Sequence, residues 1–153
     1  MDYETLLDEA DSHQLKVKEK ALNQYNGLIV GNKIAIRKDI ETETEKSCVL
    51  AEELGHYYTS SGYILDQSKP ESRKQEYRAR LWAYNKMITI DKLANARKCG
   101  CRNRYEIAEY LDVTEEFLQE AIDSYKEIYG VGYHQYGDYL ICFDPLNIYR
   151  VTE

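Results

Sequence analysis

The sequence lacks any apolar run long enough to cross a membrane. A membrane-spanning helix needs about 20 mostly apolar residues, and the 153 residues contain no such run. The chain opens with Met1, Asp2, Tyr3 and Glu4, so its start is acidic where a secretory signal peptide would be basic. We therefore expect a soluble, cytoplasmic protein without membrane contacts.

An excess of basic residues is also lacking. The chain has 20 Lys and Arg against 27 Asp and Glu, which gives a formal net charge of -7 and a pI near 5.1. Proteins that bind nucleic acids in general neutralise phosphates with Lys and Arg. The charge balance therefore argues against a general nucleic-acid binder and indicates a solvated acidic surface.

Cysteine is scarce and irregularly spaced. The four cysteines, Cys48, Cys99, Cys101 and Cys142, do not form the framework of a disulfide-rich protein. Cys99 and Cys101 could be half of a metal site, but they lack Cys-x-x-Cys spacing and a matching second pair. We expect reduced cysteines and a structural role for this pair.

The stretch CVLAEELGHYY at residues 48–58 contains a variant of the metallopeptidase signature H-E-x-x-H. In that signature, histidines at i and i+4 lie on one helix face and bind one Zn²⁺, with the Glu beside the catalytic water. Here Glu52 replaces the first His, while Glu53 and His56 keep their positions. A carboxylate oxygen binds Zn²⁺ at roughly 2.0–2.2 Å, about the distance of an imidazole nitrogen, so the replacement is compatible with zinc binding.

A small antiparallel sheet is expected just before this stretch. Residues 3–11 have helical apolar spacing, and residues 16–21 weakly predict a strand. Residues 27–36 contain two apolar runs joined by Gly31 and Asn32, which predicts a hairpin. An exposed edge of such a sheet could accept an extended substrate as an added strand. The same pattern fits a sheet that only covers the back of the helix.

The key helix is predicted at about residues 45–58. Thr42 and Glu45 have the spacing of a capping box. Burial would make the adjacent carboxylates of Glu52 and Glu53 costly unless they hold a cation or share a proton. Gly55 costs about 1 kcal/mol relative to Ala in a helix interior, so we expect it to serve close packing or access.

A second helix is predicted after SKPE (residues 68–71), with Ser68 as its N-cap and the proline in its first turn. Glu76, Ala79 and Ala83 then fall on one face at i, i+3 and i+7. The small side chains would let this helix approach another while Glu76 projects into the gap. Taken alone, a Glu on a charged helix is usually a solvated residue.

The C-terminal part has a different character. Residues 90–98 predict a short helix that ends near a glycine. Residues 104–122 have the apolar spacing of a helix-turn-helix, with Val113 in the turn and Thr114 capping the second helix. Residues 131–143 could add a wing-like hairpin.

The second helix of this module is acidic, which bears on whether it binds DNA. Phosphates would repel its Asp and Glu side chains. We therefore interpret the module as a packing and partner-recognition element and argue against direct DNA binding, keeping a DNA-binding regulator as a third alternative. The acidic residues are Glu115, Glu116, Glu120, Asp123 and Glu127.

Three stretches resemble the ImmA/IrrE metallopeptidases of phages and integrative elements. They are CVLAEELGH at residues 48–56, RKQEYRARLWA at residues 73–83 and CRNRYEIAEYL at residues 101–111. Members of that family typically inactivate a repressor of the mobile element, in characterised cases by site-specific cleavage. The resemblance implies a protein substrate, namely a helix-turn-helix repressor, whose basic surface would be attracted to an acidic one.

The resemblance also implies a set of site residues. Glu76 matches the family pattern E-x-x-A-x-x-F-A, with Trp82 at the aromatic position, and would be the third zinc ligand beside Glu52 and His56. Glu53 would act as general base towards a water whose pKa the Zn²⁺ lowers to about 7. Two carboxylate ligands are expected to make the zinc a weaker Lewis acid than in a two-His site.

The other histidines and several tyrosines stay open. His13 and His134 could enter the site as substitute ligands or oxyanion donors, or could be surface residues. Tyr57, Tyr58 and Tyr77 flank the motifs and could donate to an oxyanion. Their positions in the sequence assign them no role.

We predict an α+β protein with a small antiparallel sheet packed on a gluzincin-like active-site helix, a helix-turn-helix-like C-terminal portion and a terminal hairpin. Residues 1–88 would form a minimal metallopeptidase core, and residues 89–153 the helical portion packed on it. The predicted function is a zinc-dependent endopeptidase that inactivates a phage or mobile-element repressor by cleavage. The alternative is a non-catalytic antirepressor or regulatory binding protein on a degenerate metallopeptidase scaffold.

Overall fold

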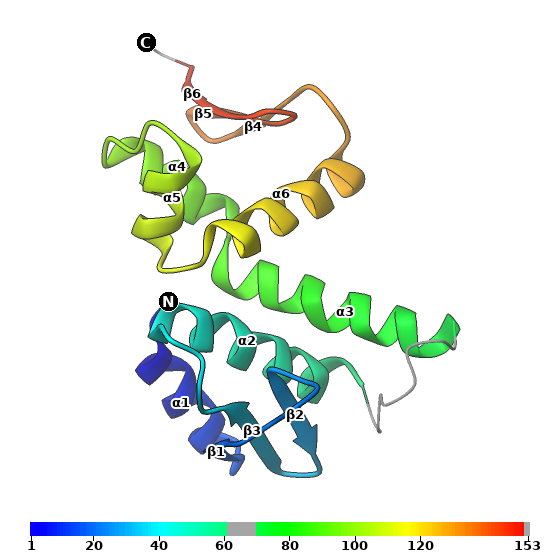
Figure 1. Cartoon of the computed structure of the whole chain (residues 1–153). Helices are drawn as coiled ribbons and strands as arrows, with labels where there is room; N and C mark the ends of the chain where they lie inside the picture. Colours follow the sequence, from blue (N-terminus) through cyan, green and yellow to red (C-terminus); the bar gives the residue numbers. More distant parts are fainter. Residues whose placement is uncertain (61–69, 152–153) are drawn as a thin grey trace. The chain divides into compact units, whose positions relative to one another are not determined.

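The protein is α+β, as its sequence predicted. A computed structural model describes residues 1–60 and 70–151, and within these residues there are six helices and six strands. The chain divides into two units, Met1–Met87 and Ile88–Glu153, and their elements are labelled in Figure 1. None of the described helices combines the length and the apolar character that crossing a membrane requires.

The first unit holds three helices and one sheet. The Asp2 side chain begins the first helix by accepting a hydrogen bond from the backbone N–H of Thr5 at 2.8 Å, which satisfies one of the free N–H groups of the first turn. The elements are α1 (Tyr3–Ser12), β1 (Lys16–Lys20), β2 (Gly27–Val30), β3 (Lys33–Arg37), α2 (Glu43–Thr59) and α3 (Pro70–Met87).

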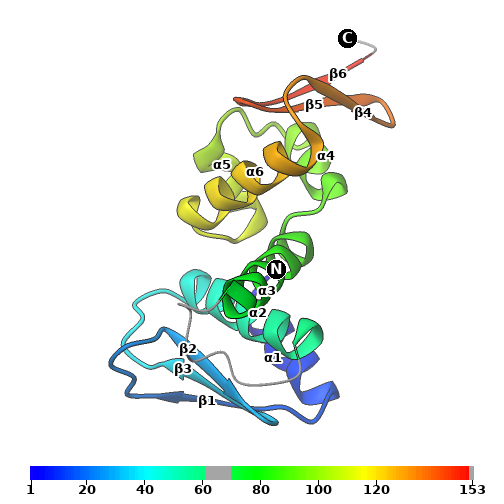
Figure 2. The ribbon, with the colours of Figure 1, turned by 90° about the vertical axis from the view of Figure 1, so that its right-hand side faces the viewer.

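The sheet of this unit is mixed rather than wholly antiparallel. β2 and β3 form the predicted antiparallel hairpin, with Gly31 at φ 59° in its turn. β1, however, pairs with β3 in parallel, and the strand order is β1-β3-β2. The hairpin thereby puts β3 in the centre, where Ile34 and Ile36 are almost fully buried. Figure 2 shows this sheet beside α2.

Helix α2 is the centre of the first unit. Its start is fixed by Thr42, whose hydroxyl accepts a hydrogen bond from Glu45 N at 3.1 Å, as the capping-box spacing predicted. It packs against α1, α3 and both strands of the hairpin, and it lies between α1 and α3 (Figure 1). Leu50 and Leu54 are completely buried. The helix is therefore surrounded by protein, so polar groups on it lie in a poorly hydrated place.

The start of α3 lies partly outside the described residues. Pro70 is the first helical residue, the position where a proline costs no hydrogen bond. The predicted cap, Ser68, falls in the part that the structure does not describe. The predicted contact face is confirmed, because Ala79 and Ala83 are fully buried.

The second unit contains the predicted helix-turn-helix. Asp112 has a left-handed conformation in the turn, Val113 is buried there, and the Thr114 hydroxyl accepts a hydrogen bond from Phe117 N at 3.0 Å. The hydroxyl of the buried Tyr125 donates to the Ile88 carbonyl at 2.8 Å. The helices are α4 (Ile90–Lys98), α5 (Arg104–Leu111) and α6 (Glu115–Tyr129).

The C-terminal sheet has one strand more than the predicted hairpin. β4 (Tyr133–Tyr136) and β5 (Tyr139–Phe143) form the hairpin around Gly137, and β6 (Leu146–Arg150) pairs antiparallel with β5. In β6 only Ile148 is buried, and Tyr149 and Arg150 are exposed.

Candidate metal centre

Helices α2 and α3 approach each other through a glycine. A Cβ atom on Gly55 would lie only 2.3 Å from the carbonyl oxygen of Ala79, far inside ordinary contact. This explains why the costly glycine stands in the helix interior, as the sequence suggested. The close approach falls next to His56 on α2 and one turn from Glu76 on α3.

His56 and Glu76 face each other across this contact. His56 Nε2 lies 3.4 Å from Glu76 Oε1, and only 11% and 18% of the two side chains are exposed. This separation is longer than a good N–H···O hydrogen bond of about 2.7–3.2 Å. It is the separation of two ligands on one tetrahedral zinc ion, about 3.3 Å for bonds of about 2.0–2.1 Å.

The second ring nitrogen of His56 is unsatisfied. Nδ1 is buried and has no hydrogen-bond partner among the described residues. A buried polar atom without a partner costs about 1–3 kcal/mol, and a zinc ion bound by Nε2 would not satisfy Nδ1, so the support for zinc comes from the Nε2 side of the ring. The imidazole and the Glu76 carboxylate are also donors that zinc prefers. The donor set therefore fits a zinc ion.

Glu53, on the same helix α2, lies close to strand β2. It is 8% exposed and is one of two buried polar residues reported for the described chain. A Cβ atom on Gly27, the first residue of β2, would lie 2.8 Å from Glu53 Oε1 and 2.7 Å from Val49 Cγ1. Only a glycine at this strand position leaves room for the carboxylate.

Burial and neighbouring charges change the acidity of both groups. Burial raises the pKa of Glu53 to about 7; the charge of His56 opposes this change, and the carboxylates of Glu52 and Glu76 add to it. Burial by itself would lower the pKa of His56, but the contact with Glu76 and the nearby carboxylates outweigh it, so the pKa of His56 lies above its usual value. A shared cation would relieve the same crowding of carboxylates.

The four predicted site residues therefore share one electrostatic neighbourhood, although only two stand in direct contact. Glu52 is half-buried and acts on the pKa values of Glu53 and His56 through its charge. In residues 1–60 and 70–151, no group of three or more His, Cys, Asp or Glu side chains is arranged to hold a metal ion. The assignment of Glu52, His56 and Glu76 as three zinc ligands thus stays a prediction.

The other candidate residues lie elsewhere. The rings of His13, Tyr57, Tyr58 and Trp82 form an aromatic cluster, in which Tyr58 stacks on Trp82 at 4.8 Å between ring centroids. Two of the three tyrosines that we considered as oxyanion donors, Tyr57 and Tyr58, thus pack in this cluster. Tyr77 is 38% exposed.

The candidates of the second unit contact other partners. His134 Nε2 lies 3.5 Å from the Gly130 carbonyl. The Cys99 thiol lies 3.7 Å from the hydroxyl of Tyr110, and the Cys101 thiol 3.6 Å from the carbonyl of Glu106. The side chains of the Cys-x-Cys pair therefore face a tyrosine hydroxyl and a backbone carbonyl.

Two contributors to the site escaped the sequence analysis. Gly27 was read only as the start of a hairpin, although a glycine inside a strand often marks a close approach of another group. The Ala79 carbonyl, which Gly55 accommodates, carries no signal in the sequence because every residue has a carbonyl.

Comparison with known proteins gives one match. A family model described as Peptidase_M78, IrrE N-terminal-like domain, matches residues 9–123. No curated protein and no solved structure matches the chain. The matched range includes α2, α3 and the helix-turn-helix, and thus all three stretches on which the family resemblance rested.

Proposed function

Since the chain belongs to the Peptidase_M78 family of IrrE N-terminal-like domains, we propose that it is a zinc-dependent endopeptidase that cleaves a repressor protein. Membership supports a metallopeptidase scaffold and a protein substrate. The zinc ion, the residues that hold it and the repressor are the parts that we add.

The observation that carries the proposal is the pairing of His56 with Glu76. Two helices supply one donor atom each, 3.4 Å apart and largely shielded from water. Glu52 lies one helical turn before His56 on α2, so its carboxylate can join them from the same helix face. We propose these three residues as the zinc ligands. Zinc held there would polarise a peptide carbonyl and acidify a water molecule.

Glu53 is the proposed general base. Burial raises the pKa of this carboxyl group above its ordinary value, which favours a role as proton acceptor. It would take the proton of the attacking water and give it to the leaving nitrogen of the cleaved peptide. Because Gly27 has no side chain, β2 leaves room for this carboxylate in both its protonated and its ionised form.

Strand β2 is the proposed binding edge for the substrate. It pairs with β3 on one side and is the last strand in the order β1-β3-β2. Its first residue lies against Glu53. An extended peptide that added to this edge would run past the proposed base with its backbone fixed by hydrogen bonds.

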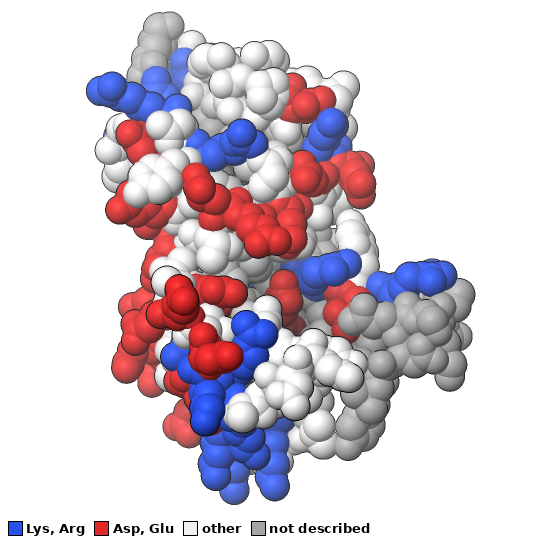
Figure 3. Space-filling view, viewed as in Figure 1, with Lys and Arg blue, Asp and Glu red and all other residues white. Residues whose placement is uncertain are grey.

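The exposed face of α6 is the proposed docking surface for the repressor. Asp and Glu side chains gather over this helix (Figure 3). A helix-turn-helix repressor is basic where it meets DNA, so charge attraction would speed the encounter and weaken with salt. The exposed acidic residues are Glu115, Glu116, Glu120, Asp123 and Glu127.

A non-catalytic antirepressor on the same scaffold is the second candidate. It is favoured by the Glu at position 52, where the general metallopeptidase signature H-E-x-x-H has His, and by the lack of a three-residue metal cluster in the described part of the chain. Such a protein would inactivate the repressor by binding alone.

Two measurements distinguish these candidates. Native mass spectrometry should find one zinc per chain, lost in Glu76→Ala and kept in the neighbouring Gln75→Ala. Glu53→Gln should keep the zinc and abolish cleavage of the repressor, whereas Glu45→Gln on the same helix should cleave normally. Repressor inactivation that survives Glu53→Gln would establish the binding protein and end the peptidase hypothesis.

A further inference from the structure

A cavity of about 560 Å³ lies in the second unit. The end of α4, the start of α5 and strand β6 surround it, with Arg97, Arg102, Arg104, Asn147 and Tyr149 among its lining residues. Its size is within the range of small-molecule pockets, roughly 300–1,000 Å³. All of its walls come from one unit.

The charge of this cavity contrasts with that of the chain. Three arginines line it, and none of its lining residues, all of which are described, is Asp or Glu. The protein as a whole carries a net charge of -7. Arginines that line a cavity without a carboxylate in its walls give it a positive charge, which favours an anionic ligand.

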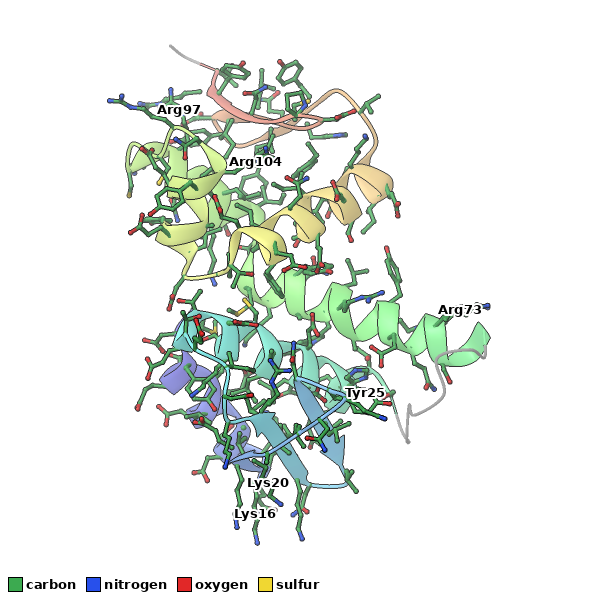
Figure 4. The ribbon with its side chains drawn as sticks, viewed as in Figure 1. Lys16, Lys20, Tyr25, Arg73, Arg97 and Arg104 are labelled. Atoms are coloured by element: carbon green, nitrogen blue, oxygen red, sulfur yellow. The ribbon has the colours of Figure 1, made fainter. Side chains whose placement is uncertain are left out.

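Two of the arginines are held in place by hydrogen bonds. Arg97 Nε donates to the Ile148 carbonyl on β6 at 3.2 Å, and Arg104 donates to the Gln119 side chain on α6. Figure 4 labels both residues, one on α4 and one at the start of α5. Fixed guanidinium groups lose less side-chain entropy when they bind a ligand.

The start of α5 adds to the positive potential. Asn103 caps this eight-residue helix by accepting a hydrogen bond from Glu106 N at 2.9 Å. The helix dipole places partial positive charge at this end. The Glu106 carboxylate accepts from Arg102 N at 2.6 Å and partly offsets that charge, but it does not line the cavity.

We propose that this cavity binds a phosphate-bearing small molecule. A phosphate ester carries about -1.5 to -2 charges at neutral pH and offers three acceptor oxygens, which suits three arginines better than a singly charged carboxylate. Tyr149, which is 48% exposed, is among the lining residues, and the Tyr133 ring lies 5.8 Å from its ring between centroids. A flat group on the ligand could stack there.

The test is a titration of the full chain followed by two-dimensional amide NMR. The probes are inorganic phosphate, adenosine monophosphate, adenosine and citrate, with the ionic strength held constant by chloride. We expect saturable shifts with both phosphate compounds, centred on residues 100–104 and 146–149. Arg102→Gln combined with Arg104→Gln should weaken binding at least tenfold, while Arg150→Gln, in the same unit and outside the lining, should change it less than twofold.

A second variant keeps the test independent of misfolding. Arg104→Lys retains the charge but loses the planar fork that matches phosphate, and it should weaken binding several-fold with an unchanged amide spectrum. Shifts spread over all exposed Lys and Arg, or equal losses in Arg150→Gln, would refute the proposal. If adenosine bound and the two phosphate compounds did not, or if citrate bound more tightly than phosphate, the choice of a phosphate group would be refuted.

Discussion

Replacing Gly55 by Ala tests whether the close helix contact builds the proposed site. The added Cβ would stand 2.3 Å from the Ala79 carbonyl oxygen and 2.9 Å from its carbon. Restoring ordinary contact at about 3.4 Å requires α2 and α3 to separate by about 1 Å. A backbone carbonyl cannot rotate away as a side chain can, so the helices themselves must move.

The expected free-energy change follows from two opposing effects. Overpacking of a tight contact costs about 1–3 kcal/mol, while Ala gains about 1 kcal/mol over Gly in a helix interior. Because the clash is with backbone, we expect the upper end of the cost and a net loss of about 2 kcal/mol. The same movement should pull His56 away from Glu76 and weaken zinc binding at least tenfold.

Urea denaturation can be followed by the fluorescence of Trp82, the single tryptophan, which lies on α3 and stacks on Tyr58 of α2. Zinc affinity is measured by competition with a chromophoric chelator. Asn95→Ala, an exposed helical substitution in the second unit, controls for general effects of alanine. If Gly55→Ala stabilised the protein and bound zinc normally, the packing argument would be wrong.

Three further predictions concern the base, the pH and a cap. Gly27→Ala should reduce peptidase turnover at least tenfold without loss of zinc, because its Cβ would meet the Glu53 carboxylate at 2.8 Å; Val30→Ala on the same strand is the control, and a fully active Gly27→Ala would contradict the assignment. In metal-free protein, Glu53 has a pKa of about 7 when folded, against an ordinary value of 4.5 when unfolded. The folded state therefore binds a proton more tightly, and the free energy of unfolding should fall as the pH rises from about 4.5 to 7. The expected fall is roughly 3 kcal/mol, at about 1.4 kcal/mol per pKa unit. The raised pKa of His56 also lowers the free energy of unfolding as the pH rises above the ordinary pKa of histidine. Glu53→Gln should make the denaturation midpoint depend less on pH between pH 5 and 8. An equally steep dependence in that variant would show that groups other than Glu53 cause it. Thr114→Ala should lower the free energy of unfolding by about 1 kcal/mol, because its hydroxyl caps α6, and an unchanged urea midpoint would refute this.

Local signals in the sequence predicted most of the secondary structure. Thr42 and Thr114 cap the helices that they were expected to cap, Gly31 turns the hairpin, and Val113 fills the turn of the helix-turn-helix. Each of these features depends on residues within a few positions of one another. Short-range hydrogen bonding and backbone preference therefore decide them before the chain has folded.

Pairings over longer distances were not visible in the same way. The parallel pairing of β1 with β3 depends on the path of the chain around the hairpin, and β6 is recognised as a strand only through its pairing with β5. The three arginines that line the cavity are close in the sequence, but the β6 residues that line it with them lie far along the chain. The spacing of these residues along the chain does not predict that they line one cavity.

The candidate metal site divides in the same way. The sequence alone determined that Glu52, Glu53 and His56 share one helix, since the spacing of side chains on a helix is fixed by its 3.6-residue turn, and the family resemblance pointed to Glu76. Only the tertiary structure brought Glu76 within 3.4 Å of His56 and put Gly27 against Glu53. Those distances follow from how two helices and a strand pack, because the closest approach of their backbones is decided by which side chains are absent at the contact.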